Sequence, residues 1–178
     1  MPRANRQGQR LAAAEAAATA AHDGRAQARR PGLALVLDPV AARRQALMSR
    51  LEALGFAVQG EADTEAALRT CWRELPTLVF VHAEAAGQTD AHDRQTDAGA
   101  DAAALVARFT RLPKAGERTV IGCLSRHDAR AGVRMLLAGA RDCLICPVDV
   151  DTLRQRLMLA GVPVDEETSL PDRTRPFA

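Results

Sequence analysis

The chain has 178 residues, of which 47% are hydrophobic and 26% charged, a composition typical of one globular domain with additional residues at its ends. Its 24 Lys and Arg residues nearly balance its 22 Asp and Glu residues, so the net charge of +2 gives no whole-chain indication of nucleic-acid binding. Tyr is absent and Trp occurs once, which argues against stacking platforms for single-stranded nucleic acid.

The first 31 residues are rich in Ala, Arg and Gln and hold six arginines against Glu15 and Asp23. We predict that residues 1–31 form a basic tail, disordered or partly helical, because alanine favours helix but offers little surface to bury. An alternative is a basic arm that binds nucleic acid. The chain shows no leucine-rich signal-peptide core and no run of about 20 apolar residues, so a cytoplasmic location without membrane contact is expected.

From residue 32 to about 161, short apolar runs of strand length alternate with amphipathic stretches of helical period. The predicted strands are 33–37, 56–59, 78–81, 119–124 and 142–145. The predicted helices are one that Gly55 ends, one that Thr64 caps and that runs to about 73, and three at about 101–111, 128–137 and 150–159. Residues 83–99 are polar without a period and are expected to form a flexible loop. Residues 162–178 are expected to be a loose tail.

Strands that are apolar on both faces and separated by helices predict an α/β three-layer sandwich, with a five-stranded parallel sheet covered on both sides. The crossovers of such a sheet are right-handed, and ligands bind at the carboxyl ends of its strands. The candidate site therefore consists of the residues that follow the apolar runs: Asp38, Pro39, His82, Ser125, Arg126, Cys146 and Pro147.

Several phrases of the sequence resemble the receiver domain of bacterial response regulators, the CheY-like family. They are Asp38 at the end of the first strand, its spacing to LEALGF (51–56), PTLVFVHAEAAG at the third strand, Ser125 after the fourth, and GARDCLICPVD (139–149) around the fifth. The resemblance covers about residues 33–160. It implies the flavodoxin-like strand order 2-1-3-4-5 and a signalling module of two-component systems that is not an enzyme.

The resemblance also assigns roles to the strand ends. In the family, two acidic residues after strand one hold Mg²⁺, an Asp after strand three accepts a phosphoryl group, and a hydroxyl and a Lys grip the phosphoryl oxygens. Asp38 and Ser125 match this pattern, whereas Pro39 replaces the second acidic residue, His82 the acceptor and Cys146 the Lys. The pattern implies a pseudo-receiver: a phosphorylation-independent interaction module of signalling or regulation, without cofactor.

A relocated acceptor is an alternative, with Glu84 or Asp90 approaching the pocket from the loop after His82. The only lysine, Lys114, lies in the turn before strand four, on the amino side of the predicted sheet. It is therefore too far from the pocket to replace the missing amine.

The degenerate pocket itself leaves three interpretations open. His82 fills the vacated space, hydrogen-bonded to Asp38 or Ser125. Alternatively, Asp38, His82 and Cys146 converge as O, N and S ligands for zinc, or Cys146 is a reactive thiol whose pKa His82 lowers. A Cys143–Cys146 disulfide is not expected, because residues three apart in a strand are separated by roughly 10 Å. The four cysteines are expected to be reduced.

The helices that flank strand five carry arginines: Arg130, Arg134, Arg154 and Arg156. In the family, the face formed by helix four, strand five and helix five mediates dimerisation and partner contact. The resemblance therefore implies a protein partner or a homodimer through this face. The alternative is that these arginines form a solvated surface.

Overall fold

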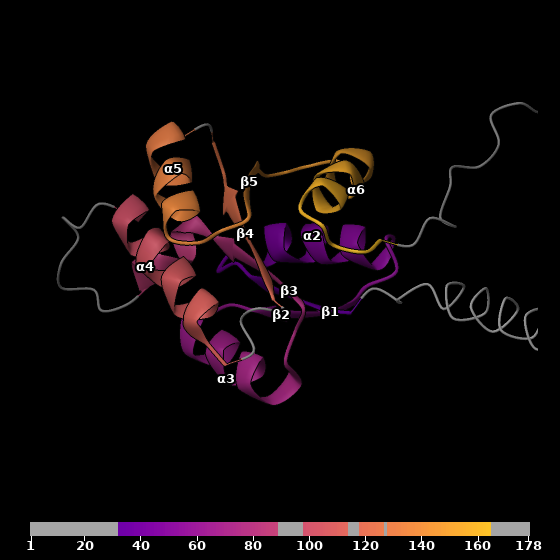
Figure 1. Cartoon of the computed structure of the whole chain (residues 1–178), viewed down its shortest axis with the longest axis horizontal. Coiled ribbons are helices and arrows are strands. Elements are labelled where there is room, and N and C mark those ends of the chain that lie inside the picture. Colours follow the sequence, from indigo (N-terminus) through magenta and orange to yellow (C-terminus); the bar gives the residue numbers. More distant parts are fainter. Residues whose placement is uncertain (1–31, 89–97, 114–117, 127, 165–178) are drawn as a thin grey trace, which may run out of the picture. The chain divides into compact units, whose positions relative to one another are not determined.

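The computed structural model describes residues 32–88, 98–113, 118–126 and 128–164. At its centre is a five-stranded sheet in the order β2-β1-β3-β4-β5, with every neighbouring pair parallel (Figure 1). The predicted fold class and strand order are therefore confirmed. The strands are β1 (Leu33–Leu37), β2 (Ala57–Glu61), β3 (Leu78–His82), β4 (Thr119–Leu124) and β5 (Asp142–Ile145).

Helices cover both faces of this sheet. One face carries α2 (Ala41–Glu52) and α6 (Val150–Leu159), and the other carries α3 (Thr64–Glu74), α4 (Ala98–Arg111) and α5 (Ala129–Leu137) (Figure 1). The central strand β3 is buried along its whole length, with Leu78 and Phe80 in the core beneath α2 and α6 and Val79 and Val81 in the other core. Period-two alternation of apolar residues thus divides one strand between two cores.

Three helices begin at an aspartate whose carboxylate accepts a hydrogen bond from a backbone N–H of the first turn. Asp63 caps α3 through the amide of Ala66 at 2.8 Å, so the prediction that Thr64 caps this helix is wrong by one residue. Asp128 and Asp149 cap α5 and α6 in the same way. The glycine that follows α2, Gly55, has a φ of 87°, a left-handed conformation that favours glycine.

The structure extends some of the predicted elements. Within the predicted loop 83–99, Ala83–Gln88 forms a 3-10 helix (η1), and α4 begins at Ala98 rather than near 101; residues 89–97 lie outside the described residues. Val162 is 7% exposed and packs beneath α2 and α6, so the core continues past residue 161. Both predicted tails otherwise lie outside the described residues.

Among the residues that the structure describes, no helix is both long enough and apolar enough to span a bilayer.

Candidate functional site

Four side chains meet at the carboxyl ends of the three central strands. Asp38 follows β1, His82 ends β3, Glu84 lies in η1 directly after it, and Ser125 follows β4. Asp38 and His82 are only 4% and 2% exposed, whereas Ser125 lies at the surface. The sheet therefore brings together Asp38, His82 and Ser125, as the candidate site requires.

The centre of this group is Arg43, from the first turn of α2. Its Nε donates to Asp38 Oδ2 and its Nη2 to Asp38 Oδ1, each at 3.0 Å, which is the two-pronged geometry of a strong arginine–carboxylate pair. Asp38 Oδ1 also accepts the backbone N–H of Val40 at 2.8 Å. Both carboxylate oxygens of Asp38 are therefore engaged.

The same guanidinium reaches the ends of two further strands. Nη2 donates to Glu84 Oε2 at 2.7 Å, and Nη1 donates to Ser125 Oγ at 3.0 Å. The hydrogen bonds and charges of Asp38 and Glu84 raise the pKa of Arg43 further above its already high ordinary value. Arg43 is therefore a permanent cation that connects β1, η1 and the end of β4.

His82 lies beneath this arginine and completes the network. Its Nδ1 accepts the backbone N–H of Glu84 at 3.2 Å, so the proton of the neutral ring is on Nε2, which donates to Ser125 Oγ at 3.2 Å. Ser125 Oγ in turn donates to Glu84 Oε1 at 2.6 Å. The serine hydroxyl thus uses its one donor and both acceptor positions within the site. His82 is bonded to Ser125 and not to Asp38.

Burial and hydrogen bonding set the charges of the site. Burial lowers the pKa of His82, which favours the neutral imidazole. The hydrogen bond from Ser125, together with Arg43, lowers the pKa of Glu84 and favours its carboxylate. At neutral pH the site therefore contains one guanidinium, two carboxylates and a neutral ring.

These contacts bear directly on the Mg²⁺ site implied by the receiver resemblance. The guanidinium of Arg43 holds the carboxylate that would be the remaining metal ligand, and Pro39 offers no side-chain donor. No three His, Cys, Asp or Glu side chains in the described ranges are placed to hold a metal ion, and this includes the trio Asp38, His82 and Cys146. A divalent cation would have to displace Arg43.

The two cysteines of the Cys-x-x-Cys sequence lie in different environments. Cys143 packs against the core beneath α3–α5, where its Sγ donates to the Gly132 carbonyl at 3.5 Å, and Cys146 packs against the opposite core. The hydrogen bond between Cys146 and Cys123 lowers the pKa of Cys146, and the charges of Arg43 and Arg50 act in the same direction. His82 is not among the main causes of this lowering, and the reactive-thiol hypothesis stays a prediction.

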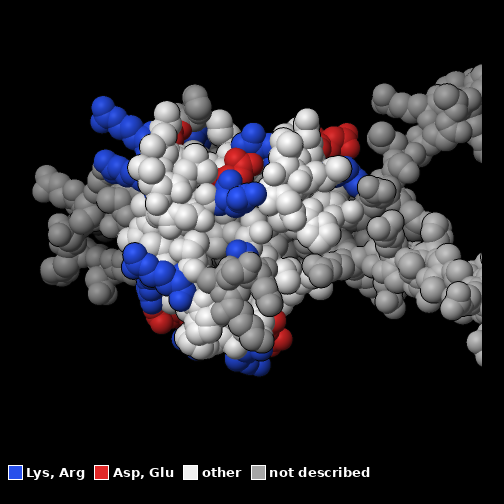
Figure 2. All heavy atoms as spheres, in the orientation of Figure 1, with Lys and Arg blue, Asp and Glu red and all other residues white. Residues whose placement is uncertain are grey.

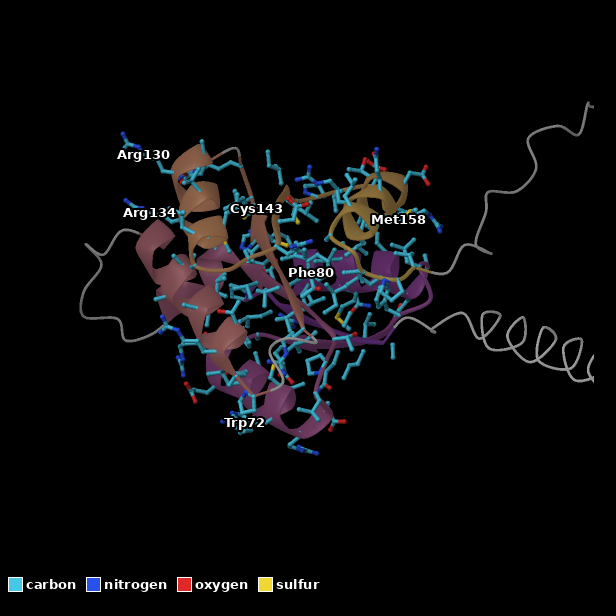
Figure 3. All side chains as sticks on the ribbon, in the orientation of Figure 1. Trp72, Phe80, Arg130, Arg134, Cys143 and Met158 are labelled. Carbon is cyan, nitrogen blue, oxygen red and sulfur yellow. The ribbon has the colours of Figure 1, made fainter. Side chains whose placement is uncertain are left out.

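The remaining predicted residues lie apart from the network. Arg126 is exposed, and Lys114 and Asp90 lie outside the described residues. In Figure 3, Arg130 and Arg134 extend from the side of α5 that faces away from β5 and α6. Arg156 lies across the edge strand, with Nη2 donating to Asp142 Oδ1 at 2.6 Å and to the Cys143 carbonyl at 3.3 Å. Arg130 and Arg134 therefore extend away from the edge strand that Arg156 contacts.

Sequence reasoning missed Arg43, the residue that organises the site. The available signal was a cation five residues after the strand-ending Asp38, in the first turn of the following helix, but Arg44 stands beside it with the same charge. The Nη1 of Arg44 donates to the backbone carbonyl of Asp38 at 2.6 Å. Only the helix orientation distinguishes the arginine that reaches the carboxylate from the one that does not.

Comparison with known proteins identifies the fold. No protein-family model matches the sequence, and no curated protein matches it either. Solved structures of similar fold include a response regulator from Thermotoga maritima (TM-score 0.59, 21% identity, 73% of this chain and 97% of that one). A putative response regulator from Chloroflexus aurantiacus has a TM-score of 0.61 and 21% identity, over 73% of this chain and 97% of that one. The chemotaxis protein CheY4 of Vibrio cholerae has a TM-score of 0.59 and 15% identity, over 73% of this chain and 98% of that one. The chain therefore has the receiver fold.

We expect Arg43→Met to lower the free energy of unfolding by about 2–4 kcal/mol, because it leaves the buried carboxylate of Asp38 without its partner. Adding Asp38→Asn should recover part of this loss, since the double variant contains no unpaired buried charge. Urea denaturation measures both effects. Arg44→Met is the matched control and should cost about 1 kcal/mol or less, because it removes one hydrogen bond to a carbonyl. Equal losses in the two single variants would contradict the central place of Arg43.

The pKa of His82 predicts a pH dependence of stability. Burial is the main cause that lowers the pKa of His82; the charge of Arg43 acts in the same direction, and those of Asp38 and Glu84 oppose it. The unfolded chain therefore takes up a proton below about pH 6.5 before the folded chain does. This contribution to stability is fully present above pH 6.5 and is lost as the pH falls through the folded pKa. When the pH is lowered from 7.5 to 5.5, the free energy of unfolding should fall less in His82→Gln than in the wild type. Parallel pH profiles would contradict the prediction.

Proposed function

We propose that this chain is a phosphorylation-independent interaction module with a receiver fold. The guanidinium of Arg43 occupies the site at the strand ends where the receiver family binds a cation and a phosphoryl group. The observation that carries the proposal is the guanidinium of Arg43, hydrogen-bonded at once to Asp38, Glu84 and Ser125. The residue at the acceptor position, His82, is neutral and fills the floor of the site. The site is thus held in one arrangement by the chain itself.

The chemistry of phosphoryl transfer supports this proposal. Transfer to a carboxylate relies on a metal ion and cationic groups that neutralise the charge of the phosphoryl oxygens. Here the remaining metal-ligand position, Asp38, is paired with Arg43, and an apolar thiol, Cys146, occupies the position of the amine. Glu84 accepts hydrogen bonds from Ser125 and Arg43, which engage one oxygen each and oppose its use as a nucleophile.

A surface suited to protein contact lies on α5, β5 and α6. Six of the nine large hydrophobic residues exposed in the described part of the chain belong to these three elements: Val133, Leu136, Leu137, Ile145, Met158 and Leu159. In Figure 2, white atoms cover much of the surface over α5 and α6, blue side chains lie at the outer margin of α5, and a small group of blue and red atoms lies between the two helices. Apolar groups gathered on one face favour association. We propose that a second copy of the chain binds this face.

Incubation with acetyl phosphate and Mg²⁺ tests the first part of the proposal. We expect no acid-labile phosphoryl group in intact-mass or phosphate-affinity gel analysis, while an active receiver domain in the same reaction is labelled. The Glu84→Gln variant is the control for a relocated acceptor. A label on the wild type that Glu84→Gln abolishes would contradict phosphorylation independence and identify Glu84 as the acceptor.

Sedimentation velocity tests the second part. We expect the full-length chain to form a dimer whose dissociation constant rises at least tenfold in Ile145→Glu or Leu159→Glu, because each places a charge on the apolar face. Trp72→Glu is the matched control: Trp72 is 59% exposed but lies on α3, and its substitution should leave the dimer unchanged. A chain that stays monomeric at all concentrations would contradict self-association through this face.

A further inference from the structure

A cavity of about 240 Å³ lies on the α2 and α6 face of the sheet, beside the Arg43 network. Its walls come from α2, from the ends of β1, β3 and β4, and from the connection between β5 and α6. The polar members of the lining are Asp38, Arg43, Arg50 and His82. The rest of the lining is apolar or thiol and includes Ala46, Phe80, Cys123 and Cys146. Figure 3 labels Phe80, which lies beneath α2 in the middle of the sheet.

The polar groups of this cavity differ in whether their charge is compensated. Asp38 is paired with Arg43, which also pairs with Glu84 outside the lining, and His82 favours its neutral form. Arg50 is different: its Nη1 donates to the Ala46 carbonyl at 2.6 Å, and no carboxylate in the described part of the chain pairs with it. A guanidinium has five N–H donors, so Arg50 keeps donors for a further acceptor. The charge of Arg50 at the cavity wall is therefore not compensated by a direct ion pair within the described residues.

The floor of the cavity carries two thiols. Cys123 is 2% exposed and Cys146 is half-buried, and both line the cavity. Both are small and polarisable, so the floor offers an apolar surface rather than competing hydrogen-bond donors. The Cys146 thiol also provides a chemical reporter, because a ligand that fills the cavity would cover it.

We propose that this cavity binds a small amphipathic anion, a monocarboxylate whose apolar body fills the space over Cys146 and whose carboxylate pairs with Arg50. Three observations support it: a mostly apolar lining, a half-buried guanidinium at the wall without a carboxylate partner in the described part of the chain, and a lining whose one carboxylate, Asp38, is held by Arg43. The volume is below the roughly 300–1,000 Å³ of clefts that hold drug-sized ligands, which favours a short-chain acid. The site goes beyond the proposed protein interaction and does not depend on it.

Titration calorimetry of the full-length chain with octanoate tests the proposal, with 1-octanol and acetate as comparison ligands. We expect octanoate to bind and both comparison ligands to bind at least tenfold more weakly. 1-Octanol lacks the carboxylate that pairs with Arg50, and acetate lacks the alkyl chain that fills the cavity. Arg50→Gln should weaken octanoate about tenfold and leave 1-octanol unchanged, as expected for the loss of one charged hydrogen bond. Ala46→Leu should weaken both, because its side chain fills the cavity. Arg69→Gln, on α3, is the matched control and should change neither.

Alkylation of Cys146 by iodoacetamide, followed by peptide mass spectrometry, gives a second measurement. Octanoate should slow modification of Cys146 in the wild type but not in Ala46→Leu, provided that circular dichroism shows the variant to be folded. Binding of octanoate without protection of Cys146, equal binding of octanoate and 1-octanol, or no binding to the folded wild type would each overturn the proposal. None of these outcomes depends on dimerisation or phosphorylation, so the proposed function is tested separately.

Discussion

The hydrogen-bonded pair between Arg43 and Asp38 is the interaction on which the rest of the site depends. Asp38 is almost fully buried at the end of β1, and a buried carboxylate is costly unless it is paired and hydrogen-bonded. Arg43 meets that requirement with two donors, and its remaining N–H groups determine where Glu84 and Ser125 lie. Once these two are placed, the backbone amide of Glu84 fixes the tautomer of His82. One long side chain thus determines the geometry of three strand ends.

The fold could be predicted from the sequence because its main signals are local. Strands such as 78–81 are continuous apolar runs, and runs that alternate with helices of clear period predict five parallel strands. The strand order was implied by the resemblance to the receiver family. Small errors arose where two adjacent residues have similar chemistry. Asp63 and Thr64 are both good caps, and the structure uses the aspartate. Val162 falls in the predicted tail because two valines separated by Pro163 give no helical period, although both pack into or against the core.

The candidate site was predicted only in part. The residues that end the strands could be named, because parallel topology places them together whatever their side chains do. The partners of those residues could not, because a long arginine side chain has several staggered rotamers at each bond and its target is decided by tertiary structure. The missing Lys and acceptor Asp indicated an altered pocket, but nothing in the local pattern indicated that α2 would supply a cation. The hydrogen bond of Cys146 to Cys123 depends in the same way on side-chain packing across β4 and β5.

The edge strand β5 has a further consequence for the dimer proposed above. An edge strand presents unpaired backbone groups, and these invite another strand to extend the sheet without limit. Here Arg156 is anchored by Asp142 and donates to the carbonyl of Cys143, so part of that edge is already occupied by the chain's own side chain. In the proposed dimer, contact would therefore be made by the side chains of α5, β5 and α6 rather than by backbone groups of β5. A two-fold contact of this kind closes into a pair, whereas pairing of β5 with the opposite edge strand β2 of another copy would be open-ended.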